Sequence, residues 1–125
     1  MTDMPQVRTI LIVEDDDVWA RSWERALQGK VNFVWASSLA EGERLFRETP
    51  GIVLIVMDAC VDNGGERPDS MPLTRRIRET FAGPMIAASR SHKYRRMLLH
   101  AGCNYEVSEE GDKADVPHLV MKLLG

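Results

Sequence analysis

The chain has 125 residues, with 44% hydrophobic and 28% charged residues and a formal net charge of −3. This length fits a single domain with one packed core, and the weakly acidic balance argues against direct binding of nucleic acid. The N-terminus lacks the apolar region of a signal peptide and no apolar run is long enough to span a bilayer, so we expect a soluble, cytoplasmic protein without membrane association.

Apolar runs and helical stripes alternate along the chain. Runs that are apolar at almost every position are typical of parallel strands buried on both faces. Between them, apolar residues recur at helical spacing, as at Trp19, Trp23 and Leu27. The predicted elements in chain order are a strand at Thr9–Val13, a helix ending at Gly29, a strand at Val31–Ala36, a helix between Ser38 and Pro50, a strand at Ile52–Met57, a helix between Ser70 and Gly83, a strand at Met85–Ala88, a helix at Ser91–Ala101, a strand at Asn104–Val107 and a helix from Asp115.

A strand followed by a helix, repeated five times, predicts an α/β fold. Right-handed crossovers place helices on both faces of a parallel sheet, which gives a three-layer, doubly wound (βα)5 domain with a five-stranded parallel sheet. We expect one domain over residues 1–125, with its core at about residues 9–124. Ligands of such sheets bind beyond the carboxyl ends of the strands.

Polar residues stand at that edge of the predicted sheet. Glu14 and Asp15 follow the first strand, Asp58 follows the third, and Ser89 follows the fourth. Each acid alone is an ordinary N-cap or turn former, but the set predicts one acidic pocket in which carboxylates share a cation. Oxygen ligands suit Mg²⁺, beside which one carboxylate can act as a nucleophile toward phosphorus.

Four motifs in this order resemble the response-regulator receiver domains of two-component signalling. The resemblance covers the chain from about Thr9 to Leu124 and implies a flavodoxin-like sheet with strand order 2-1-3-4-5. It also implies a stand-alone signalling module rather than an enzyme, although a receiver can catalyse its own phosphorylation and dephosphorylation. The motifs are Ile10–Asp16, Val53–Asp58, Pro84–Ser89 and Ala101–Tyr105.

The resemblance implies a role for each acid of the predicted pocket. Asp58 accepts a phosphoryl group from a histidine kinase or a phosphotransfer protein. Glu14 and Asp15 hold Mg²⁺ together with Asp58 and the backbone carbonyl of Cys60.

The resemblance also implies how the signal leaves the pocket. Ser89 is the switch residue that turns to the phosphoryl group, and Tyr105 follows it as the aromatic switch. Output then goes to a protein partner on the face of the fourth helix, last strand and last helix, and a homodimer through the basic fourth helix stays open.

The cationic side of the pocket departs from the family pattern. Receivers normally carry a lysine at the end of the last strand, where this chain has Ser108. Lys113 is the nearest lysine, and we expect it to be a solvated loop residue. Arg90 directly follows Ser89 and either gates the pocket and replaces part of the missing charge, or points to solvent. The missing lysine keeps open an alternative function, a phosphorylation-independent pseudo-receiver that acts as a protein-interaction module.

Two further segments also differ from the family or carry unusual charge. The loop at 61–69 is expanded, and Asp62 either adds a metal ligand or forms an Asx turn, of which we favour the turn. A basic surface is expected on the fourth helix, although a solvated polar helix face is the commoner explanation. The residues that form it are Arg90, His92, Lys93, Arg95 and Arg96.

The cysteines disfavour two other classes of site. A phosphatase of the haloacid-dehalogenase type also forms an aspartyl phosphate, but it needs a second aspartate where Cys60 stands. Cys60 and Cys103 lack metal-ligand spacing, so we expect two reduced thiols.

Overall fold

The computed structural model describes residues 7–108 and 112–125. The prediction that the N-terminus is no signal peptide therefore falls mostly on residues outside the described part. The described strands form one parallel sheet in the order β2-β1-β3-β4-β5, so the predicted fold class and strand order are confirmed. The strands are β1 (Thr9–Val13), β2 (Asn32–Ala36), β3 (Ile52–Met57), β4 (Met85–Ala87) and β5 (Tyr105–Glu106).

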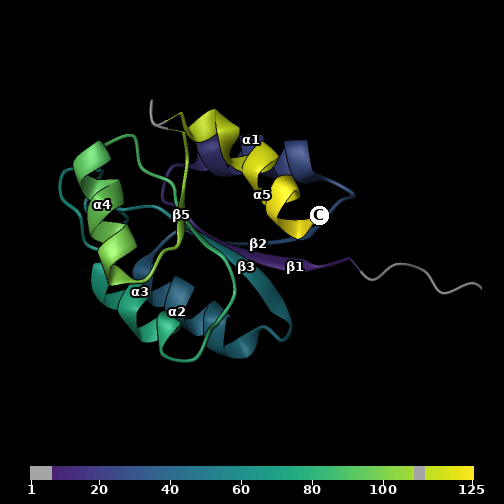
Figure 1. Cartoon of the computed structure of the whole chain (residues 1–125), viewed down its shortest axis with the longest axis horizontal. Coiled ribbons are helices and arrows are strands. Elements are labelled where there is room, and N and C mark those ends of the chain that lie inside the picture. The colour runs from purple at the N-terminus through teal and green to yellow at the C-terminus, as the bar shows by residue number, and fades with distance from the viewer. Residues whose placement is uncertain (1–6, 109–111) are drawn as a thin grey trace, which may run out of the picture.

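Helices cover both faces of this sheet. Figure 1 shows α1 and α5 on one side, and α2 and α3 on the other. A short 3-10 helix, η1 (Lys113–Asp115), leads directly into α5. The α-helices are α1 (Asp17–Leu27), α2 (Leu39–Glu48), α3 (Met71–Arg78), α4 (His92–Ala101) and α5 (Val116–Leu124).

Alternate residues of the central strands face opposite layers, which explains why these strands are apolar throughout. Ile10 and Ile12 of β1 pack in one core cluster with Trp23 of α1 and residues of α5. Leu11 and Val13 pack in the other cluster, with residues of α3 and α4. Because side chains of a strand point alternately to its two faces, a strand between two helical layers needs apolar residues at every position.

The carboxyl ends of β1, β3 and β4 lie side by side. Val13 pairs with Met57, and Met57 pairs with Ala87. The Val13 carbonyl accepts a hydrogen bond from the Asp58 N–H at 3.0 Å, so the residues that follow β1 and β3 are held next to each other. The register thus brings the predicted site residues to one edge of the sheet.

The prediction that Arg95 lies on the basic surface of α4 is wrong. Arg95 is 1% exposed. Its guanidinium points inward because buried backbone carbonyls and the carboxylate of Glu106 accept its hydrogen bonds.

Candidate functional site

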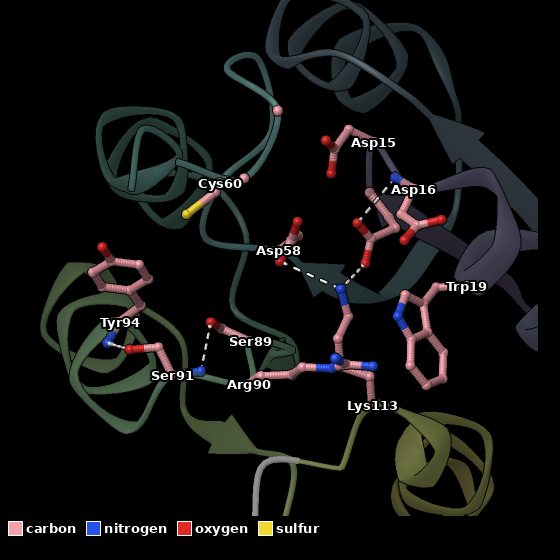
Figure 2. A pocket seen from close by; sticks show the side chains of 13 residues that line it. Asp15, Asp16, Trp19, Asp58, Cys60, Ser89, Arg90, Ser91, Tyr94 and Lys113 are labelled. Carbon is pink, nitrogen blue, oxygen red and sulfur yellow. Dashed lines mark hydrogen bonds and ion pairs between the residues drawn. The ribbon is translucent and has the colours of Figure 1, made fainter. Parts of the chain in front are cut away.

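A pocket of about 350 Å³ lies at the carboxyl edge of the sheet. Figure 2 shows Asp58 near its centre, Lys113 and Trp19 on one side, and Ser89 and Tyr94 on another. The structure therefore brings together the predicted residues from the ends of β1, β3 and β4. The lining residues are Glu14, Asp15, Asp16, Trp19, Asp58, Cys60, Gly64, Gly65, Ser89, Arg90, Ser91, Tyr94 and Lys113.

Three carboxylates in this pocket lie close enough to share one metal ion. Glu14, Asp15 and Asp58 each offer an oxygen, and these oxygens lie within 4.8 Å of one another. Glu14 is fully buried and Asp58 is 8% exposed, whereas Asp15 is half-buried. This hard, anionic donor set fits Mg²⁺, which binds through one or two carboxylates and keeps several waters.

Burial makes the ionised forms of these acids costly. It is the largest cause that raises the pKa of Glu14 from 4.5 to about 9, and the charge of Asp58 raises it further while Lys113 lowers it. Burial also raises the pKa of Asp58 from 3.8 to about 6, against the lowering effects of Lys113 and of hydrogen bonds from Glu14 and the Ala59 backbone. A cation in the pocket would favour both ionised forms.

The prediction that Lys113 is a solvated loop residue is wrong. Lys113 is 7% exposed, and its ammonium contacts Glu14 Oε1 and lies 3.6 Å from Asp58 Oδ1. Figure 2 shows this ammonium pointing into the pocket toward Asp58. Ser108, which takes the place of the expected lysine in the sequence, does not line the pocket. The cation absent from the end of the last strand is therefore supplied from η1.

Two tryptophans of α1 hold Lys113 in this position. The Trp23 indole N–H donates to the Lys113 carbonyl at 2.8 Å, and both groups are buried. The Lys113 ammonium lies 5.8 Å from the ring centroid of Trp19 and 5.7 Å from that of Trp23, within the range of cation–π attraction. Asp112 caps η1 by accepting from the Ala114 N–H at 2.9 Å. The contacts of Lys113 with the two tryptophans span about 90 residues of sequence, so no local pattern could have revealed them.

The expected switch residues occupy different environments. Ser89 is buried in the pocket, and its hydroxyl oxygen accepts from the Ser91 N–H at 3.2 Å. Tyr105, on β5, is 40% exposed and does not line the pocket. Arg90 is exposed but lines the pocket, with its guanidinium 5.5 Å from the Trp19 ring centroid. Of the two alternatives for Arg90, the structure favours a place at the margin of the pocket.

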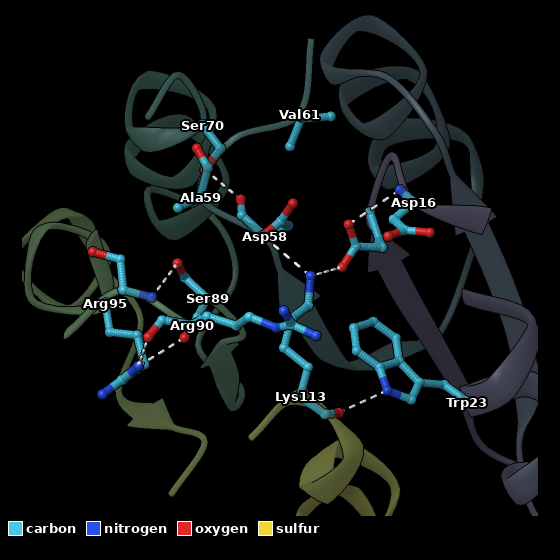
Figure 3. A network of polar contacts seen from close by, with 12 residues as sticks. Asp16, Trp23, Asp58, Ala59, Val61, Ser70, Ser89, Arg90, Arg95 and Lys113 are labelled. Carbon is cyan, nitrogen blue, oxygen red and sulfur yellow. Dashed lines mark hydrogen bonds and ion pairs between the residues drawn. The ribbon is translucent and has the colours of Figure 1, made fainter. Parts of the chain in front are cut away.

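Ser70 has a role that its sequence position did not predict. It is the residue before α3, but its side chain does not cap that helix. Its buried hydroxyl instead donates to the backbone carbonyls of Asp58 at 2.6 Å and Ala59 at 3.2 Å. This bond fixes the backbone directly after the carboxylate at the centre of the pocket (Figure 3).

The loop at 61–69 is held by two aspartates. Asp69 accepts from the N–H groups of Val61 at 2.7 Å and Asp62 at 2.8 Å. The Asp62 carboxylate accepts from the N–H of Leu39, the first residue of α2, at 3.0 Å. The predicted Asx turn at Asp62 is therefore wrong, because this side chain ties the loop to α2, far along the chain.

Cys60 lines the pocket but is a protonated thiol at neutral pH. Burial, together with the charges of nearby aspartates, raises the pKa of its thiol to about 11. Cys103 is also buried, and both cysteines are free.

No protein-family model and no curated protein matches the sequence. Solved structures match over most of the chain. A receiver domain protein (CheY-like) from Methanospirillum hungatei JF-1 is 17% identical, with a TM-score of 0.71 and coverage of 94% of this chain and 93% of that chain. A two-component response regulator from Clostridium difficile is 16% identical, with a TM-score of 0.77 and coverage of 94% and 95%. A response regulator from Thermotoga maritima is 22% identical, with a TM-score of 0.68 and coverage of 95% and 98%.

These similarities show that the chain has the fold of response-regulator receiver domains. At this level of identity they establish the shared fold, and the chemistry of the pocket has to be argued from the residues of this chain. Within the described residues, none of the helices combines the length and the apolar character that crossing a bilayer requires.

Proposed function

We propose that this chain is a single receiver domain of two-component signalling that accepts a phosphoryl group on Asp58 in the presence of Mg²⁺. The observation that carries this proposal is the position of Lys113 in a pocket with three carboxylates. The sequence lacks a lysine at the end of the last strand, and η1 brings one to the same pocket. The shared fold supports the same class of signalling module.

The transfer needs a nucleophile, a cation and a leaving group. A carboxylate oxygen of Asp58 attacks the phosphorus of a phosphohistidine on a kinase or phosphotransfer protein. The phosphorus–nitrogen bond breaks, and the imidazole leaves with its electron pair and takes up a proton. Lys113 lies 3.6 Å from Asp58 Oδ1, where an ammonium stabilises the negative charge of the transferred group.

The acids of the pocket would hold the metal. Glu14, Asp15 and Asp58 provide carboxylate oxygens, and we propose the Cys60 carbonyl as a further ligand. Mg²⁺, when bound, neutralises charge on the phosphoryl oxygens. Since the Lys113 ammonium contacts Glu14, ion binding requires the two cations to share that carboxylate or Lys113 to shift toward the phosphoryl group.

The output of the module remains part of the proposal. The Ser89 hydroxyl would leave the Ser91 N–H and turn to the phosphoryl group, and Tyr105 would follow as the aromatic switch. A protein partner on the α4–β5–α5 face, a homodimer and a place in the cytoplasm also stay predictions, as does catalysis of its own phosphorylation and dephosphorylation.

A second candidate is a pseudo-receiver that binds partners without phosphorylation. It is favoured by the contact of Lys113 with Glu14, because an internal ammonium can balance the buried acids without any metal ion. In that case the pocket would be a structural ion-pair network, and the protein surface alone would carry the function.

Intact-mass measurement separates the two candidates. The protein is incubated with phosphoramidate or acetyl phosphate and Mg²⁺, and we expect the mass of one added phosphoryl group in the wild type and in Asp17→Asn. Asp17 is an exposed acid of α1 and serves as the matched control for Asp58→Asn, in which the adduct should be lost. Absence of an adduct in the wild type, together with no Mg²⁺ binding by calorimetry, would favour the pseudo-receiver.

A further inference from the structure

The buried side chain of Arg95 joins the loop that carries Ser89 to the last strand. Its Nη1 donates to the backbone carbonyl of Ser89 at 2.8 Å and to that of Arg90 at 3.0 Å. Its Nε donates to Glu106 Oε1 of β5 at 3.0 Å. Figure 3 shows the guanidinium reaching both carbonyls of the loop. One side chain of α4 thus connects this loop and β5.

Burying the guanidinium of Arg95 costs desolvation free energy, so this placement calls for a role that an apolar residue could not fill. Burying a guanidinium requires that its N–H groups be paired, and an apolar side chain would fill the same space without that requirement. The planar fork of arginine holds several acceptors at fixed angles, which a lysine ammonium does not. A displacement of one acceptor of Arg95 is therefore passed to the others.

The acceptors of Arg95 include the backbone that has to move if Ser89 switches. The Ser89 hydroxyl oxygen now accepts from the Ser91 N–H at the start of α4. If the hydroxyl turned to a phosphoryl group on Asp58, this bond would be lost and the loop would be released from the start of α4. The Ser89 and Arg90 carbonyls would move with the loop, and both are held by the same nitrogen of Arg95.

Glu106 is the receiving end of this connection. Its side chain is 30% exposed, so a change at Arg95 reaches the surface at β5. Tyr105 is the preceding residue of the same strand and points to the opposite face. The carboxylate of Glu106 accepts the hydrogen bond from Arg95 and so links β5 to α4.

We propose that Arg95 is a positioning residue that transmits a displacement of the Ser89 loop to Glu106, so that the state of the Asp58 pocket is read at the surface of α4 and β5. The trigger of this movement rests on the proposed function, since it is phosphorylation of Asp58. The coupling itself rests on the contacts of Arg95 with the loop and with β5, and does not require phosphorylation.

The coupling is tested first without phosphorylation, by backbone amide chemical shifts of the full chain. We expect Glu106→Gln to move the amide resonances of Ser89 and Arg90, because Arg95 is hydrogen-bonded to Glu106 and to the carbonyls of both residues. In an Arg95→Lys background the same substitution should leave those resonances in place. Arg96→Lys, a change at the exposed neighbour on α4, is the control background in which the transmission persists. Unchanged Ser89 and Arg90 resonances in the single Glu106→Gln variant would overturn the proposal.

The second measurement adds phosphoramidate and Mg²⁺ and records the mass adduct and the shifts together. We expect Arg95→Lys and Glu106→Gln to form the adduct, while the shift changes at Tyr105 and Val107 fall to less than half of those in the wild type. An adduct with wild-type shift changes in both variants overturns the coupling. A wild type that forms no adduct removes the proposed function instead, and the first measurement then decides the role of Arg95 alone.

Discussion

Replacing Lys113 with methionine tests whether its ammonium balances the acidic pocket. Nζ lies 3.6 Å from Asp58 Oδ1 and contacts Glu14 Oε1, and the side chain is 8% exposed. At an effective dielectric constant of about 20, one contact at this distance amounts to about 4–5 kcal/mol before the cost of desolvation is subtracted. At about pH 8 Glu14, whose pKa is about 9, is mostly protonated, whereas Asp58, whose pKa is about 6, is ionised. Because the variant leaves the buried Asp58 carboxylate without its cation, we expect the free energy of unfolding to fall by about 3–5 kcal/mol at about pH 8.

Two conditions should reduce this loss. Below about pH 6, Asp58 takes up a proton in the variant while Glu14 is already protonated, and a neutral carboxyl needs no counter-ion. Mg²⁺ should also rescue the variant, since binding at a hundredfold excess over Kd stabilises a protein by about 2.7 kcal/mol and the more negative pocket binds the ion more tightly. Urea-induced unfolding, followed by tryptophan fluorescence at both pH values with and without Mg²⁺, measures these effects.

Lys122→Met is the matched control, because Lys122 is an exposed lysine of α5. Its free energy of unfolding should stay within about 0.5 kcal/mol of the wild type. Equal decreases in the free energy of unfolding for Lys113→Met and Lys122→Met at about pH 8 without Mg²⁺ would refute the reasoning. Removing a lysine that balances buried acids should destabilise the protein more than removing an exposed lysine.

Three other parts of the structure give predictions of the same kind. Trp23→Phe removes the donor to the buried Lys113 carbonyl and should lower the free energy of unfolding by about 1–3 kcal/mol in urea, with slower phosphorylation by mass spectrometry; an unchanged rate would show that this bond does not position the ammonium. Glu14 has a raised pKa, so in the metal-free wild type its contribution to stability is complete below about pH 4 and is lost as the pH rises toward about 9. The stability of Glu14→Gln relative to the wild type should therefore rise over this window in urea titrations, and a flat difference would contradict the assigned pKa. Gly102→Ala should lower the free energy of unfolding by about 1–3 kcal/mol in thermal unfolding, since φ is +144° and the new Cβ would lie 3.0 Å from Arg78 Cβ; a neutral result would mean that the turn relaxes.

The sequence determined the layers of the fold and the edge at which the acids meet. Apolar runs and helical stripes are local patterns, and alternation of the two leaves few arrangements other than a doubly wound parallel sheet. Glu14, Asp15 and Asp58 follow directly after two strands. The doubly wound topology dictates that these strands are neighbours in the sheet. Their convergence within 4.8 Å needed no knowledge of distant contacts.

Tertiary structure decided the cationic side of the pocket. Lys113 stands in a polar segment between Asp112 and Ala114, and such a segment is typical of a solvated loop. It is buried because α1 and α5 meet there, so that Trp23 binds its carbonyl and Glu14 receives its ammonium. The sequence predicted Arg95 on the surface, and this prediction failed for the same reason. The acceptors that bury its guanidinium lie in the β4–α4 loop and on β5.

Apolar residues and buried charges therefore differ in how far sequence can place them. An apolar residue is driven from water by its own surface, so its spacing along the chain reports the face that it buries. A buried charge is tolerated only where its counter-charge and acceptors converge, and those groups come from separate elements. The acids of the pocket could be placed from the sequence because the ends of parallel strands meet by rule, whereas Lys113 and Arg95 could be placed only when their partners had been brought together in space.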